Sequence, residues 1–238
     1  MMDLRRLFKN HFDTKEISDD NMKKFAEVHL ERLSANNGTA QFTAMITATT
    51  AAYTAYFGAI ANEDTKFAIQ QGLTVTMNNI FENFKKFVSQ KEGIVRGNFS
   101  KTSAEYQEFF PLGVTEYSNA NLANIETLMM RFFAAAERHN AALGSAMQSD
   151  AENFLTDFKA ARKAQLEKIG EVSAQKSTTS TTRDGIENEL MKNVHLIASM
   201  FIGDVDRCMD FFDQSFIRSN GKDDDEEETP TDPTPPTP

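Results

Sequence analysis

The chain contains a single cysteine, Cys208, among its 238 residues. One cysteine excludes an intramolecular disulfide, and it disfavours a structural zinc site, which is built from four Cys or His ligands. Cys208 lies in an apolar helical pattern, which indicates a buried structural thiol, since a reactive thiol needs an open, electropositive surrounding. We therefore expect a reducing compartment and a cytoplasmic protein, with export by a route without a signal peptide left open.

Proline is nearly missing from most of the chain. Five of the six prolines follow residue 229, and Pro111 is the exception. Because proline breaks helix interiors, the sequence before residue 229 is free to be helical. Apolar residues recur there at helical spacing, and no segment alternates apolar and polar residues as a strand does. With short loops between the helices, we predict an all-α protein that folds as an antiparallel helical bundle.

Cap residues predict where the helices begin and end. Asn36-Asn37-Gly38 is typical of a helix C-terminus, and Gly93 and Gly144 predict further stops. A Ser, Thr or Asp with a Glu three residues later predicts a helix start. This pattern occurs at Thr102, Ser149 and Asp184. The predicted helices are 20–36, 40–61, 65–91, 102–110, 121–143, 150–174 and 184–218, and the Ser/Thr-rich residues 177–182 are predicted to form a loop.

Two parts of the chain resemble each other. Gly58 matches Gly170 at a separation of 112 residues, and Gly72 matches Gly185 at 113. We therefore predict two related three-helix halves. The predicted organisation is an N-terminal amphipathic segment 1–19, a first three-helix unit 20–91, a connector with a short helix 92–120, a second three-helix unit 121–218, and a disordered tail 219–238.

Acidic residues are concentrated near the C-terminus. The formal net charge is −10, but residues 222–238 hold seven acids and one base, so the rest of the chain carries −4. A nearly balanced body lacks the basic surface that nucleic-acid binding requires, and we expect no nucleic-acid partner. The tail combines an acidic run with Thr and Pro and cannot bury apolar surface, which predicts disorder. It is interpreted as solubilising, with a docking or targeting role as the alternative.

Motifs for catalysis and metal binding are missing. The sequence has no Glu-x-x-His pair of the kind that builds di-metal sites in bundles, and the acids near His29 and His139 lie two residues away, on other helix faces. It also lacks a G-x-S-x-G elbow, and Gly93 and Gly97 lack the Lys-Ser/Thr of a phosphate-binding loop. We predict no catalytic, cofactor-binding or metal-binding residues and expect that the chain is not an enzyme. A small-molecule-binding bundle with a dispersed site is an alternative.

The predicted helix 40–61 has an unusual composition. It lies within thirty consecutive residues, between Arg32 and Glu63, that carry no charge. Its length matches a membrane span, but five Thr and two Tyr lower its hydrophobicity, and acids follow at once. A membrane-active protein that inserts helix 40–61 is therefore kept as an alternative only.

A helix without a charged face is either enclosed or covered by another molecule. The matching helix of the second half, around residues 154–169, carries an ordinary charged face. This difference favours a protein–protein interface, either with itself as a homo-oligomer or with another protein; burial within an asymmetric monomer is the alternative. The candidate interface residues are Thr43, Thr47, Thr50, Tyr53, Thr54 and Tyr56. The predicted function is that of a structural component, adaptor or accessory subunit.

Overall fold

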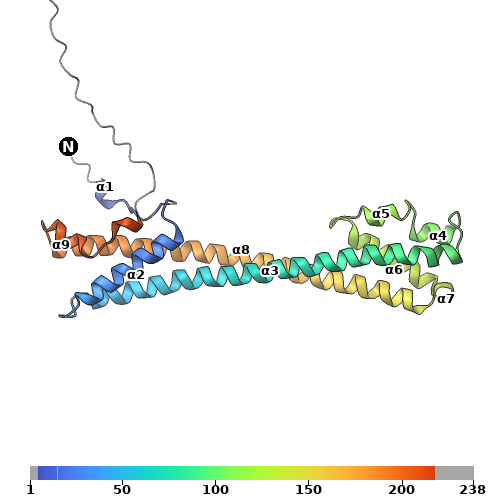
Figure 1. The fold of residues 1–238 in the computed structure, drawn as a ribbon, viewed down its shortest axis with the longest axis horizontal. Coiled ribbons are helices and arrows are strands. Elements are labelled where there is room, and N and C mark those ends of the chain that lie inside the picture. The colour runs from blue at the N-terminus through green and yellow to red at the C-terminus, as the bar shows by residue number, and fades with distance from the viewer. Residues whose placement is uncertain (1–4, 15, 218–238) are drawn as a thin grey trace, which may run out of the picture. The chain divides into compact units, whose positions relative to one another are not determined.

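The structure, a computed structural model, describes residues 5–14 and 16–217 (Figure 1). Within these ranges every regular element is a helix and none is a strand, so the predicted all-α class is confirmed. The predicted disordered tail, 219–238, lies outside the described residues.

Helix α2, Asp19–Ala35, ends where its C-terminal cap residues predict. It follows the short α1, Arg5–Phe8. The hydroxyl of Ser18 accepts a hydrogen bond from the Asn21 amide at 3.2 Å, and acidic side chains occupy the first turn, where they favour the positive end of the helix dipole. At the other end Asn36 is the C-cap, as the Asn36-Asn37-Gly38 sequence predicts.

The two longest helices correct the prediction. Helix α3 runs without a break over Thr43–Asn98 and α8 over Ser145–Met200, each 56 residues long. The loops predicted at 62–64 and 175–183 are therefore wrong, as is the three-helix content of each half. Threonine hydroxyls at these points bond to the carbonyl one turn back, as Thr65 does to Ala61 at 2.8 Å and Thr181 to Ser177 at 3.1 Å. No proline interrupts these stretches, and a helical glycine costs only about 1 kcal/mol.

Several other predicted helix boundaries are wrong. Gly93 lies inside α3, and Ser149 and Asp184 lie inside α8. The predicted helix 184–218 instead ends at Met200, before Gly203 with φ of 82°. The chain then forms α9, Val205–Met209, and a 3₁₀ turn η1, Gln214–Phe216, so Cys208 does not belong to the long helix.

Four shorter helices lie between α3 and α8: α4, Ala104–Phe109; α5, Thr115–Ser118; α6, Ile125–Arg138; and α7, Asn140–Leu143. Gly144 separates α7 from α8 with φ of 83°, which confirms the predicted stop at this residue. A side chain at this position would be strained, because L residues rarely adopt positive φ.

The described residues group into two compact units. Unit 1 takes its residues from Met1–Phe57 and Thr182–Pro238, and unit 2 is Gly58–Thr181. Parts of α3 and α8 belong to each unit, so each unit mixes residues from both predicted halves. Within each unit, residues further along α3 contact residues with lower numbers in α8, so the two helices are antiparallel. In unit 2, for example, Thr74 bonds Gln165 at 2.9 Å and Lys91 pairs with Asp150 at 3.5 Å.

Each unit has its own apolar core. The core of unit 2 is rich in aromatic rings from α3, α4, α5 and α6, where Phe84 and Phe132 meet edge to face with centroids 6.1 Å apart. In unit 1 one cluster joins the end of α2 to α3, α8 and the segment after α9. Its buried members are Leu33, Phe42, Met45, Ile197 and Phe211.

Candidate functional site

The part of α3 that belongs to unit 1 presents an uncharged surface, here called the Thr/Ala face. It forms a shallow apolar groove of about 670 Å³ whose lining contains no acidic or basic side chain. The lining residues are Ile46, Thr47, Thr50, Ala51, Thr54 and Ala55. Ile46 is half-buried and the other five are exposed. Small side chains at this spacing allow another backbone to approach closely.

Four of the predicted interface residues lie on exposed positions: Thr43, Thr47, Thr50 and Thr54. The Thr47 hydroxyl donates to the carbonyl oxygen of Thr43 at 2.9 Å, so its hydrogen is used within the helix. The Thr43 hydroxyl oxygen accepts from the Asn37 amide at 3.0 Å. The face is therefore less polar than its composition indicates, because part of its hydrogen-bonding capacity is already used.

The two predicted tyrosines face α2 instead. Tyr56 is 1% exposed and Tyr53 is half-buried. The hydroxyl of Tyr53 donates to Glu27 and that of Tyr56 to Asp19. Burial, followed by the contact with Glu27, raises the pKa of Tyr53 to about 12. Tyr56 is thus a correction to the candidate set: its ring is part of the interior, because α2 covers it.

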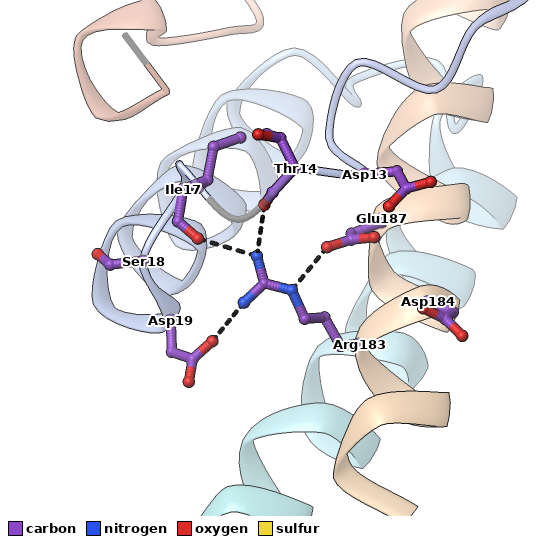
Figure 2. Close-up of a pocket in the computed structure, with 8 residues that line it drawn as sticks. All are labelled: Asp13, Thr14, Ile17, Ser18, Asp19, Arg183, Asp184 and Glu187. Carbon is purple, nitrogen blue, oxygen red and sulfur yellow. Dashed lines mark hydrogen bonds and ion pairs between the residues drawn. The ribbon is translucent and has the colours of Figure 1, made fainter. Parts of the chain in front are cut away.

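A second feature was not found by sequence reasoning. A pocket of about 570 Å³ lies between the segment before α2, the first residue of α2 and helix α8 (Figure 2). All of its lining residues belong to unit 1: Asp13, Thr14, Ile17, Ser18, Asp19, Arg183, Asp184 and Glu187.

The Arg183 guanidinium is at the centre of this pocket and uses all of its N–H groups. Nε donates to Glu187 Oε1 at 2.7 Å. One terminal nitrogen donates to the carbonyl oxygens of Thr14 and Ile17, at 3.1 and 2.8 Å, and the other to Asp19 and the Tyr56 hydroxyl. Burial opposes the charge of Arg183, but Glu187 and Tyr56 raise its pKa above the ordinary value. Since no donor is left over, Arg183 holds the chain before α2 against α8.

Glu187 is the buried partner of this arginine. It is 4% exposed, and burial raises the pKa of its carboxyl although Arg183 acts in the opposite direction. The spacing of Arg183 and Glu187, one helical turn apart, was the available sequence signal. It was missed because residues 175–183 were predicted to form a loop.

Among the described residues no group of three or more His, Cys, Asp or Glu side chains could hold a metal ion. In the same part of the chain no helix combines the length and the apolar character needed to cross a membrane. The chain matches no protein-family model, no curated protein and no solved structure at a significant level.

Proposed function

We propose that this chain is a non-enzymatic protein that acts through protein–protein contact at the Thr/Ala face, and that it associates with itself. The observation that carries the proposal is an exposed, groove-forming stretch of α3 without any charged lining residue. Charged residues are depleted at the centre of protein interfaces, because each would have to lose its hydration there.

The comparable surface of α8 is charged. Both helices have 56 residues and begin at Thr43 and Ser145, so equivalent positions are 102 residues apart. On this basis Thr50 corresponds to Glu152 and Ala55 to Asp157, and both acids are exposed. An uncharged surface where a similar helix carries acids needs an explanation other than contact with water.

We also propose that the chain is an internally duplicated antiparallel bundle, in a different register from the one the glycines indicate. Buried residues recur at a separation of 102 or 103. At 103, Met22 corresponds to Ile125, Phe25 to Leu128 and Leu33 to Ala136; at 102, Val88 corresponds to Leu190 and Val95 to Ile197. All ten are buried. Phe109 and Phe211, both fully buried, follow the same separation of 102.

The size of the face predicts weak association. Residues 46–55 cover about 15 Å of helix, at about 1.5 Å per residue. Specific interfaces bury roughly 800 Å² on each partner, which is more than one such strip supplies. We therefore expect a dimer that dissociates on dilution in the micromolar range, with neighbouring exposed residues contributing to the contact.

Light scattering during size-exclusion chromatography tests the proposal. The wild-type mass should rise above 26.7 kDa as the concentration increases. Thr50→Lys should abolish the rise, because it places a charge in the groove, and its circular dichroism should remain that of the wild type. Thr76→Lys is the matched control, since Thr76 is an exposed threonine on α3 in unit 2. A strict monomer at all concentrations, or equal effects of both lysines, would refute self-association through this face.

A further inference from the structure

Unit 1 contains a fully buried polar cluster that the proposed function does not use. His29 of α2, Thr49 of α3 and Asn193 of α8 each have 0% exposure. His29 Nδ1 lies 2.9 Å from the carbonyl oxygen of Phe211, between α9 and η1. Asn193 Nδ2 lies 3.1 Å from His29 Nε2 and 2.7 Å from Thr49 Oγ1. Four segments of unit 1 therefore meet at one imidazole.

The hydrogen bonds define the protonation state of this ring. The Phe211 carbonyl can only accept, so Nδ1 carries the hydrogen. In the neutral ring Nε2 is then an acceptor, and it receives a hydrogen bond from the Asn193 amide. This arrangement leaves Asn193 Oδ1 as the only buried side-chain nitrogen or oxygen without a partner among the described residues. Protonation would set the Nε2–H of His29 against the Asn193 NH₂ group, two donors facing each other.

Rotation of the Asn193 amide relieves that conflict only in part. With its oxygen and nitrogen exchanged, Oδ1 accepts from the protonated ring and from the Thr49 hydroxyl, but Nδ2 then takes the position without a partner. The cluster thus has two arrangements that differ by one proton and an amide rotation. Each leaves one buried polar atom unsatisfied, so neither is strongly preferred by hydrogen bonding alone.

No counter-charge compensates a protonated His29. Among the described residues His29 forms no ion pair. Burial disfavours its protonation most, the hydrogen bond to the Phe211 carbonyl favours protonation and offsets part of that effect, and the charge of Arg32, one turn along α2, disfavours it again. Arg32 itself pairs with Asp213 of the C-terminal segment at 3.7 Å. From α3 and α8 the groups against the ring are Thr49 and Asn193, neither of which titrates. Phe25 and Phe212 flank the ring, with centroids 6.5 and 4.7 Å from it.

We propose that this cluster is an acid-sensitive latch: protonation of His29 releases the α9–η1 segment, residues 205–217, from unit 1. Among the segments that meet at His29, residues 205–217 have the shortest helices, of only five and three residues. Short helices are marginal without tertiary contacts, so this segment opens before α2, which has 17 residues.

Opening would change the surroundings of the Thr/Ala face. Ile46 lines the groove and also packs against the apolar cluster that contains Phe211 and Phe212. Release of residues 205–217 uncovers this cluster next to the groove. The latch does not depend on the proposed self-association, since it concerns the closure of unit 1 in a single chain.

Hydrogen exchange of the full chain, measured by mass spectrometry at pH 7 and pH 5 and corrected for intrinsic rates, tests the latch. Burial lowers the pKa of His29 from 6.5 to about 4 in the closed form. If the open form titrates normally, the ratio of closed to open molecules falls about 20-fold between these pH values. We expect protection against exchange to fall by this factor in residues 205–217. Protection in α4 and α6 of unit 2 should change little.

Two variants make the test specific. In His29→Gln the new side chain can donate to Phe211 and accept from Asn193 but does not titrate in this range, so the protection of residues 205–217 should not depend on pH. His195→Gln, at an exposed histidine of α8, is the control and should behave as the wild type. Asn193→Asp places a carboxylate beside the ring, which favours the charged form and should move opening to lower pH. The latch is overturned if His29→Gln loses protection as the wild type does. If that variant does not fold, an unchanged opening pH in Asn193→Asp overturns it.

Discussion

Replacing Arg183 by Gln should destabilise unit 1 by about 3 kcal/mol, near the lower end of the 3–5 kcal/mol typical of a broken buried ion pair. The reason is Glu187: its side chain is 5% exposed and would lose the guanidinium at 2.7 Å. The carbonyl oxygens of Thr14 and Ile17 lose their donor as well. We choose the lower end of the range because Arg183 itself is 24% exposed, so water screens part of the interaction.

The pH dependence of this loss identifies its cause. Without Arg183, burial and the charges of Asp13 and Asp184 all act in the same direction on Glu187, so the pKa of its carboxyl in the folded state rises further above the ordinary value. Above this raised pKa the carboxyl is charged in the folded and in the unfolded state, and the destabilisation has its largest value. It decreases as the pH falls towards 4.5, the ordinary pKa of the group. Control variant Lys163→Gln changes an exposed basic residue of α8, whose side chain is 78% exposed, and should cost little.

Urea unfolding, followed by circular dichroism at pH 7.5 and pH 5, measures both effects. Exchange of Glu187 for Gln in the Arg183→Gln background should recover a large part of the loss at pH 7.5, because it removes the unpaired charge. The reasoning would be refuted if Arg183→Gln costs less than about 0.5 kcal/mol, the range of ordinary surface substitutions. It would also fail if the cost were the same at both pH values.

Three further predictions concern stability. Between pH 6.5 and about 4 the unfolded chain binds a proton at His29 that the folded chain does not, so the free energy of unfolding should fall by about 3 kcal/mol over this window; His29→Gln should remove that slope in urea titrations. Thr181→Pro should lower the free energy of unfolding by about 3 kcal/mol or more, because α8 is continuous at this residue. If residues 177–182 formed a loop, the loss would be small, and thermal unfolding distinguishes the two outcomes. Phe132→Ala should cost about 3–5 kcal/mol by leaving a cavity in the core of unit 2, whereas Phe67→Ala, at a 45% exposed ring, should cost far less in the same urea assay.

The corrected helices show how far local signals reach. The scarcity of proline and the spacing of apolar residues were enough to predict the all-α class, because both act within a few turns of one segment. Asn36 and Gly144 marked real ends for the same reason. The predicted breaks near residues 62 and 177 failed because threonine and glycine are only weak helix breakers. The threonine hydroxyls donate to carbonyl oxygens of the preceding turn instead.

The candidate sites depend on contacts between distant residues. The absence of charge between Arg32 and Glu63 was visible in the sequence, and four of the six predicted interface residues lie at exposed positions. Whether a given tyrosine faces outward was not visible, since Tyr56 is covered by α2 through Asp19, 37 positions away. His29 and Asn193 are 164 residues apart, and Arg183 and Asp19 are separated by the same number. Composition and periodicity determine which residues can form helices. Only tertiary packing determines which buried polar groups become hydrogen-bond partners, because these partners lie far apart in the sequence.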